Sequence, residues 1–228
     1  MDDSLIIFLH IPKAAGASLR KCFQMVYGHE RVFWIRPGSR AQSLKTLEEM
    51  TPAERDRIRV VTGHIPLGLV EGFFARPVDY VTVLRDPVDR IRSFYQFALA
   101  QPEHPDHGMA TRSSLAEFAA SNVRGLENQQ TRIVSGLGGK GQVTPETYAL
   151  ARRNLASFGH VGTQEGYADF VERLATRLGW PEIPDPGTIH KTDNPIQVER
   201  RVEEIILARN KWDRKLHADA RALGSNPT

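Results

Sequence analysis

Three segments of the sequence carry cations, hydroxyls or histidines directly after short apolar runs that predict β-strands. They are residues 10–18, His64 and Arg85. In open α/β sheets, ligands bind beyond the carboxyl ends of the strands, so these side chains are expected to meet at one edge of a sheet. Cations beside the N-terminus of a helix are typical of sites for phosphate and similar anions.

Residues 10–18 join a predicted strand to a predicted helix, which is the order that an anion site at a helix N-terminus needs. Gly16 lets the backbone approach phosphate oxygens, Ser18 adds a hydroxyl donor, and Lys13 adds a positive charge. The segment is not a Walker loop, because Lys13 precedes Gly16 and no second glycine precedes it. The alternative interpretation is a surface turn with a solvated lysine.

Arg85 ends another predicted strand, and a helix that begins after Asp86 and carries Ser93 follows at once. An arginine fork beside a helix N-terminus predicts a second phosphate site. The alternative is a surface ion pair of Arg85 with Asp86 or Asp89, beside an ordinary helix.

Strands and helices alternate along the chain. Apolar runs predict strands at residues 5–9, 59–62, 80–84 and 160–163. Capping signals and helical periodicity predict helices at residues 16–27, 145–157, 167–178 and 196–223, and helices that begin near residues 52, 87 and 115. This alternation predicts an α/β fold, in which a mostly parallel sheet carries helices on both faces, as a single domain over residues 1–228.

Two segments towards the C-terminus have distinctive sequence patterns. The helix at residues 196–223 places five apolar residues on one side, a stripe typical of core packing. They are Val202, Ile205, Ile206, Trp212 and Leu216. Residues 180–195 form a proline-rich loop that is long for a simple connection, so we interpret it as a lid.

Composition excludes several classes of protein. The chain has 228 residues, is 40% hydrophobic and 25% charged, and has a formal net charge of +3, as globular proteins do. It has no basic stripe, so no nucleic-acid partner is expected. Leu5–Leu9 is too short to span a membrane, Asp2 and Asp3 do not make a basic leader, and Cys22 is alone, so we expect a cytoplasmic protein with no membrane partner. No oligomeric state is predicted.

The charged segments resemble motifs of the sulfotransferase family. His10-Ile-Pro-Lys13-Ala-Ala-Gly-Ala-Ser18-Leu19 resembles its 5′-phosphosulfate loop, and residues 83–95, Val-Leu-Arg-Asp-Pro-Val-Asp-Arg-Ile-Arg-Ser-Phe-Tyr, resemble its 3′-phosphate motif. Thr-Gly-His-Ile-Pro at 62–66, Asn-Gln-Gln-Thr-Arg at 128–132 and Val-Gly-Thr-Gln-Glu at 161–165 look like the carbohydrate branch related to heparan sulfate 2-O-sulfotransferases. Together these blocks span nearly the whole chain.

The resemblance implies a P-loop-like sheet and the donor 3′-phosphoadenosine 5′-phosphosulfate. The donor-binding positions that it implies are Lys13, Ala14, Gly16, Ala17, Ser18, Arg85 and Ser93, and candidate further contacts are Leu19, Arg132 and Lys191. Lys13 and Ser18 would hold the phosphosulfate, whereas Arg85 and Ser93 would hold the 3′-phosphate. Ala14 and Ala17 stand where many members carry Thr or Gly/Ser, so some hydroxyl contacts to the donor are missing.

Sulfuryl transfer needs a cation and a base. Charge builds up on the leaving oxygen, where Lys13 is expected to neutralise it, and the acceptor hydroxyl must lose a proton. His64, at the end of a predicted strand, is the leading candidate for the base, and the resemblance places it at the catalytic histidine. Its alternative role is to cap the strand end. His10 is the rival base, although its place directly before the loop suits bracing the loop backbone.

These residues predict a sulfotransferase whose acceptor is a hydroxyl of a sugar or another small polar molecule. No metal is implied. One alternative is a P-loop kinase that uses ATP and Mg²⁺, which the missing Walker pattern disfavours. Another is a catalytically silent nucleotide-binding or scaffold protein, which would keep Lys13 and Arg85 but would need no base. Arg132 is expected either to contact a sulfate group or to pair with Glu127 or Glu165.

Overall fold

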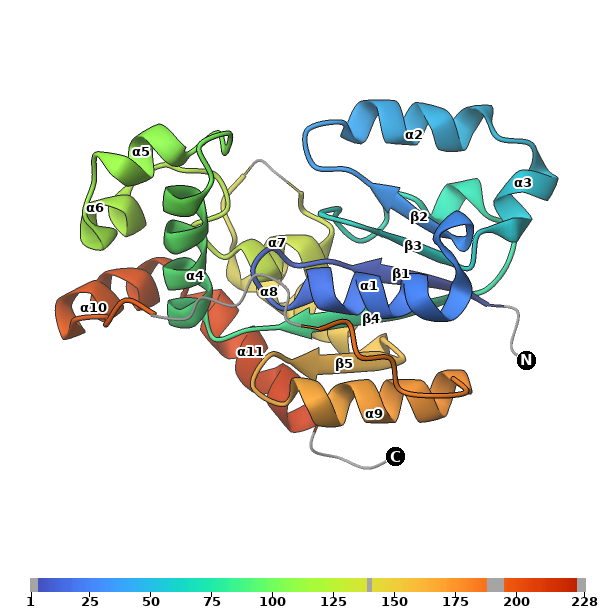
Figure 1. The fold of residues 1–228 in the computed structure, drawn as a ribbon. Helices are drawn as coiled ribbons and strands as arrows, with labels where there is room; N and C mark the ends of the chain where they lie inside the picture. Colours follow the sequence, from blue (N-terminus) through green and yellow to red (C-terminus); the bar gives the residue numbers. More distant parts are fainter. Residues whose placement is uncertain (1–3, 139–140, 188–194, 225–228) are drawn as a thin grey trace.

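The computed structural model describes residues 4–138, 141–187 and 195–224. A parallel sheet of five strands lies at its centre (Figure 1). The strands are β1 (Leu5–Leu9), β2 (Val32–Ile35), β3 (Val60–Gly63), β4 (Val78–Leu84) and β5 (His160–Thr163), in the order β2-β3-β1-β4-β5. The predicted α/β class with a parallel sheet is confirmed.

The helices follow the strands along the chain. They are α1 (Gly16–Tyr27), α2 (Arg40–Glu49), α3 (Pro52–Arg57), α4 (Pro87–Ala100), α5 (His107–Thr111), α6 (Leu115–Ala120), α7 (Gln129–Ser135), α8 (Pro145–Ser157), α9 (Tyr167–Leu178), α10 (Arg200–Arg209) and α11 (Lys211–Gly224). Two short 3₁₀ helices, η1 (His29–Arg31) and η2 (Glu71–Phe73), precede β2 and β4.

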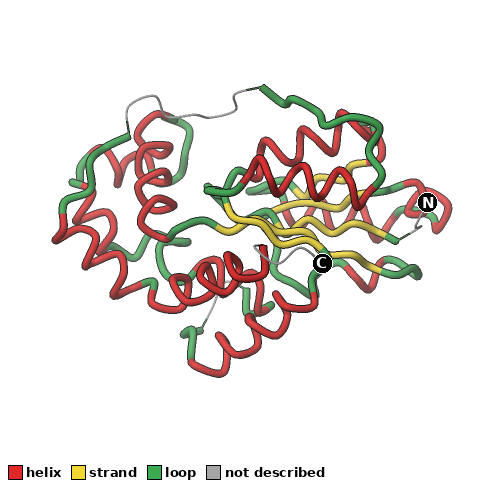
Figure 2. The backbone as a smooth tube through the Cα atoms, turned by 90° about the horizontal axis from the view of Figure 1, so that it is seen from below, coloured by secondary structure: helices red, strands yellow, loops and turns green. Residues whose placement is uncertain are grey.

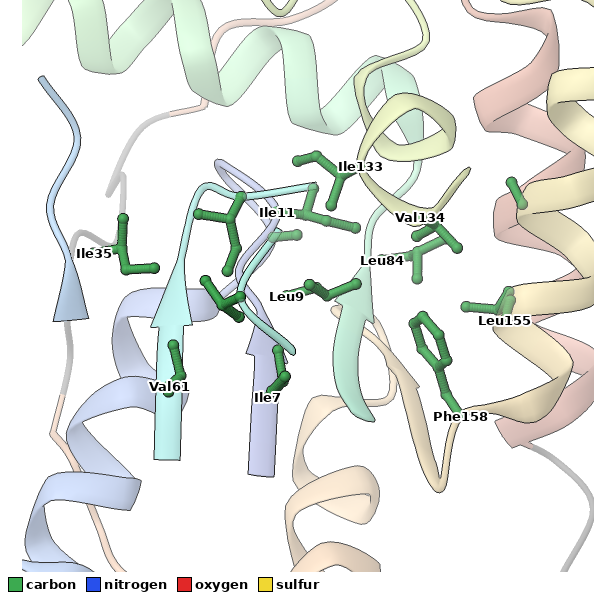
Figure 3. Packing of buried hydrophobic residues seen from close by; sticks show 14 of the residues in the cluster. Ile7, Leu9, Ile11, Ile35, Val61, Leu84, Ile133, Val134, Leu155 and Phe158 are labelled. Carbon is green, nitrogen blue, oxygen red and sulfur yellow. The ribbon is translucent and has the colours of Figure 1, made fainter. Parts of the chain in front are cut away.

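The central strand β1 is buried on both faces, as its unbroken apolar run predicts. Ile6 and Phe8 pack on one face with apolar side chains of α1 and α9. Ile7 and Leu9 pack on the other face, in a cluster that includes Leu155 of α8 and residues of α7 and α11 (Figure 3). Helices therefore cover both faces of the sheet (Figure 2).

A third apolar cluster joins α4, α5, α6 and α10, which gather beside one end of the sheet (Figure 1). The strand arrows point towards this group, so the carboxyl ends of the strands face it. The edge where the sequence predicts the functional residues therefore lies between the sheet and a group of helices.

The capping signals in the sequence set helix starts as expected. Thr51 and Ser114 each form a capping box with the glutamate three residues later, and Asp86 accepts hydrogen bonds from two amides of α4. Such caps stabilise a helix by about 1 kcal/mol each. Gly179 ends α9 with φ 63°, in the left-handed conformation that glycine adopts without strain.

The prediction of a single C-terminal helix at 196–223 is wrong, because the chain breaks into α10 and α11 at Asn210. The Asn210 side-chain amide donates to the carbonyl oxygens of Leu126 and Ile206. The apolar stripe is divided by this break: Ile206 packs in the cluster around α4, whereas Leu216 packs against the sheet.

The described part of the predicted lid, residues 180–187 and 195, begins against α1. Trp180 Nε1 donates to Tyr27 Oη at 3.0 Å, and Lys21 Nζ donates to the Pro186 carbonyl at 2.8 Å. Lys191, the candidate further contact, lies outside the described residues. Among the helices of the described ranges, none is long and apolar enough to cross a membrane.

Candidate functional site

Strands β1 and β4 are neighbours from which the chain leaves in opposite directions along the sheet. It continues from β1 to β2 and from β4 to β5, and ligands bind in the crevice at such a switch of strand order. Lys13 follows β1 and Arg85 follows β4 directly. The Arg85 guanidinium Nη1 donates to the Lys13 carbonyl at 3.0 Å, so the two predicted anion-binding segments are in contact.

The loop between β1 and α1 holds two residues in the left-handed conformation. Lys13 has φ 67° and Ala15 has φ 58°, a conformation that costs of order 1–3 kcal/mol for a residue other than glycine and clusters at functional sites. Ala15 is the N-cap of α1 and provides no side-chain hydrogen bond to it. The first amides of α1 are therefore not capped by a side chain, which suits an anion.

Gly16 is required by packing against His10. A Cβ atom built on Gly16 would lie 1.9 Å from His10 Cδ2. The His10 ring stacks on Phe8, with ring centroids 5.6 Å apart, and its Nδ1 atom is buried, so the ring has little room to move. His10 therefore braces the loop backbone, the role that its place in the sequence suggests.

We expect Gly16→Ala to destabilise the protein by about 1–3 kcal/mol, the usual cost of overpacking a core. The His10 ring would have to leave its place on Phe8 to make room for the new methyl group. Denaturant unfolding of Gly16→Ala, His10→Ala and the double variant measures this coupling. The double variant is expected to lose less stability than the sum of the single losses, and additive losses would contradict the contact.

The Lys13 ammonium lies over an aromatic ring that the sequence did not indicate. Its Nζ is 3.9 Å from the centroid of the Phe97 ring on α4. Burial, together with the positive charge of Arg85, lowers the pKa of Lys13 to about 8. A cation in a partly dry site interacts more strongly with a nearby anion than one in water.

Arg85 is held by its main chain rather than by a surface ion pair. Its amide donates to Gln130 Oε1 at 2.9 Å, and its carbonyl accepts from Gln130 Nε2 at 2.8 Å. The predicted alternative partner Asp89 instead lies 2.7 Å from Arg92. Arg85 Nε is buried and has no hydrogen-bond partner among the described residues, which leaves a donor for an anion.

The N-terminus of α4 is capped by a side chain of its own, Asp86, as the sequence predicts. The Asp86 carboxylate already accepts from the amides of Val88 and Asp89, so it occupies the end of the helix. The Ser93 side chain is half-buried on α4, and no described residue hydrogen-bonds to it. The cation of Arg85 is therefore the main candidate for an anion-binding group on this side.

His64 follows β3 at the same edge and lies against His10, with ring centroids 4.5 Å apart. Burial, together with the positive charges of Arg20 and Lys13, lowers the pKa of His64 to about 4. The imidazole is therefore neutral at pH 7 and can accept a proton. Gly63 before it allows β2 to approach, since a Cβ there would lie 2.7 Å from the Ile35 carbonyl oxygen.

Arg20 was not predicted as a site residue, yet its charge acts on both histidines. Its guanidinium lies 3.8 Å from the centroid of the Trp34 ring on β2. Burial lowers the pKa of Arg20, and its Nε is buried without a hydrogen-bond partner among the described residues. The only sequence signal was its spacing, one turn of helix beyond the start of α1.

A cavity of about 260 Å³ opens beside His64 and is lined by several arginines. The charged residues that line it are Arg40, Arg124, Glu127, Arg132 and Arg209. Arg132 Nη1 donates to the Gly141 carbonyl at 2.7 Å and its Nε to the Glu127 carbonyl at 3.2 Å, so Arg132 does not pair with Glu165. The cavity is polar and positively charged next to the histidine.

The remaining predicted positions divide between the loop and the core. Ala17 and Ser18 are half-buried in the first turn of α1, whereas Ala14 is buried. Leu19 is fully buried in the core beneath α1, and its amide donates to the Ala15 carbonyl at 3.3 Å. Leu19 therefore supports the loop from the core and presents no side chain at the site.

Two further segments of the resemblance, residues 161–165 and 128–132, hydrogen-bond to Asp86 and Arg85. Glu165 Oε1 accepts from the Asp86 amide at 3.1 Å, and its Oε2 lies 3.0 Å from His217 Nε2 on α11. Partial burial raises the pKa of Glu165, but these hydrogen bonds outweigh it and lower the value to about 2. The segment at 128–132 likewise contributes Gln130, which holds Arg85.

Two comparisons of the sequence with known proteins found no match. The chain matches none of the known family descriptions with which it was compared. It also has no significant sequence match among the curated proteins. The chemistry of the site therefore rests on its own residues: a lysine and an arginine in contact at a sheet edge, with a neutral histidine beside a basic cavity.

Proposed function

We propose that the protein is a sulfotransferase that moves a sulfuryl group from 3′-phosphoadenosine 5′-phosphosulfate to a hydroxyl of a sugar or another small polar molecule. The observation that carries this proposal is the hydrogen bond from Arg85 to the Lys13 loop. This donor bears anionic groups at both the 5′ and the 3′ position of one ribose. It therefore needs two cationic subsites close together. The Nε of Arg85, which has no hydrogen-bond partner among the described residues, gives one of them a donor.

Each residue has a defined task in this reaction. As the acceptor oxygen bonds to sulfur and the bond from sulfur to the bridging oxygen breaks, His64 accepts the hydroxyl proton. Lys13 stabilises the negative charge that develops on the bridging oxygen, which leaves as part of adenosine 3′,5′-bisphosphate. The lowered pKa keeps His64 neutral at pH 7, so the imidazole is free to accept a proton, but it also makes the imidazole a weaker base than an ordinary histidine.

The basic cavity beside His64 supports the acceptor side of the proposal. Its arginines suit an acceptor that carries an acidic or strongly polar group near the reacting hydroxyl. Gly138, which follows α7, also lines this cavity. An acceptor placed here would have its hydroxyl next to the proposed base.

Calorimetric titration with three nucleotides tests the donor. We expect adenosine 3′,5′-bisphosphate to bind about ten- to a hundredfold more tightly than AMP or ADP, because a charge-assisted hydrogen bond to the 3′-phosphate contributes roughly 1.5–3 kcal/mol. Arg85→Gln should remove this preference. Arg92→Gln is the matched control, because Arg92 lies on α4, the helix that follows Arg85, and pairs with Asp89.

Equal affinities of the wild-type protein for the three nucleotides would contradict the assignment of the 3′-phosphate to Arg85. A preference for ATP that depends on Mg²⁺ would instead favour the kinase alternative.

A further inference from the structure

The side chain of Gln130 is buried and hydrogen-bonds to both main-chain polar groups of one residue, Arg85. It is 0% exposed, and its amide both accepts from the Arg85 N–H and donates to the Arg85 carbonyl. The pairing of β4 with β5 ends at Leu84, one residue earlier. The Gln130 amide thus extends the hydrogen bonding of β4 by one residue, at the residue that carries the cation.

Gln130 is itself held by the first turn of α11. The Asp213 carboxylate, 0% exposed, accepts from the main-chain N–H of Gln130 at 3.1 Å. It also accepts from the amide and the hydroxyl of Thr131, each at 2.8 Å. In return, Asn128 Oδ1 accepts from the amides of Trp212 and Asp213. The first turns of α7 and α11 therefore fix each other, and Gln130 has little freedom.

A continuous chain of hydrogen bonds results. It runs from Asp213 through Gln130 to the main chain of Arg85, and from the Arg85 guanidinium to the Lys13 carbonyl. The position of the Arg85 guanidinium depends on the position of the Arg85 main chain. A displacement of a catalytic or binding group by about 1 Å is enough to weaken its interaction severely.

We infer that Gln130 is a positioning residue, which sets the preference of the site for a 3′-phosphorylated nucleotide by fixing the main chain of Arg85. This inference rests on the proposed function, in which Arg85 binds the 3′-phosphate. Gln130 itself does not touch the nucleotide. Its effect is expected on the discrimination between nucleotides rather than on nucleotide binding as a whole.

The test compares Gln130→Met with a matched control. Methionine has nearly the volume of glutamine but cannot make either hydrogen bond to Arg85. The control is Asn154→Leu, which removes an amide that donates to the Val134 carbonyl, near the other end of α7, at 2.9 Å. If Gln130→Met does not fold, Gln130→Asn replaces it, because its amide is one methylene too short to reach both groups of Arg85.

Two measurements are made on each variant. The first is the ratio of the dissociation constants of AMP and adenosine 3′,5′-bisphosphate, which is expected to fall about tenfold in Gln130→Met, the loss of one charge-assisted hydrogen bond. AMP affinity is expected to stay within about twofold of the wild type. The second is hydrogen exchange of the Arg85 amide, which should speed up in Gln130→Met and stay unchanged in Asn154→Leu.

The outcomes separate this inference from the proposed function. If the wild-type protein does not prefer the bisphosphate, the donor proposal fails and this inference falls with it. If the wild type discriminates but Gln130→Met keeps the full ratio, only the positioning role is overturned. An equal loss of affinity for both nucleotides, or unchanged exchange of the Arg85 amide, would also overturn it, because a residue that merely supports the fold would not act selectively.

Discussion

His64→Ala is expected to lower kcat by about 10²- to 10⁴-fold, the usual contribution of a positioned general base. The imidazole lies at the sheet edge beside the basic cavity and is neutral at pH 7. The variant should still bind the donor, because Lys13 and Arg85 follow other strands, β1 and β4. Steady-state kinetics and calorimetry with adenosine 3′,5′-bisphosphate measure the two effects separately, and His29→Ala, at an exposed histidine, serves as the control.

A variant that binds the bisphosphate normally and keeps nearly full turnover would exclude His64 as the base and turn attention to His10. Loss of folding and of binding together would instead indicate that His64 only caps the strand.

The pH profile provides an independent check on His64. Its ordinary pKa would place a rise in rate near pH 6.5, since only the neutral imidazole accepts a proton. Burial, Arg20 and Lys13 lower its pKa to about 4, so kcat/KM should rise only near pH 4 and then stay level. Above about pH 8, kcat/KM should fall as Lys13 loses its charge. A rise centred near pH 6.5 would contradict the lowered pKa of His64.

Lys13→Met is expected to lower kcat by about 10²- to 10³-fold, the range seen when one group that stabilises a developing charge is removed. Methionine keeps an apolar stem that can remain against Phe97 but carries no charge. The loss should fall mainly on kcat, because the leaving oxygen gains charge in the transition state. Lys21→Met, at an exposed lysine of α1, is the matched control.

Steady-state kinetics with the donor varied decide the role of Lys13. An unchanged kcat with only a raised KM for the donor would make Lys13 a binding residue and would remove it from the chemical step.

Local sequence patterns predicted the elements that carry their own signals. The limits of β1 and α1 match the apolar run and the helical pattern, and the capping boxes at Thr51 and Ser114 are formed. Strand β2, only four residues long, and α2, which buries Leu47 alone, carried no comparable pattern and were not predicted. The break at Asn210 was missed because helical periodicity continues across it, whereas the hydrogen bonds that stop the helix come from tertiary contacts.

The candidate site was predictable in its charges but not in its surroundings. Lys13, His64 and Arg85 follow strands, and parallel strands bring such residues to one edge without further information. The contacts of Phe97 with Lys13 and of Gln130 with Arg85 join residues far apart in the chain, so no local pattern indicates them, although the resemblance had singled out the segment at 128–132. The pKa values of Lys13 and His64 depend on burial in the folded chain, which residue types alone do not fix.

The most direct test of the proposed function is transfer itself. The wild-type protein and His64→Ala are incubated with 3′-phosphoadenosine 5′-phosphosulfate and a panel of uncharged sugars, uronic acids and phenols. Chromatography follows the release of adenosine 3′,5′-bisphosphate, and mass spectrometry follows the acceptor. We predict that the wild type releases the bisphosphate in step with sulfation of an acceptor hydroxyl, without added Mg²⁺, and that His64→Ala does so at least about a hundredfold more slowly. Phosphorylation of the same acceptors from ATP and Mg²⁺, or a donor that binds but stays intact with every acceptor, would contradict the proposal.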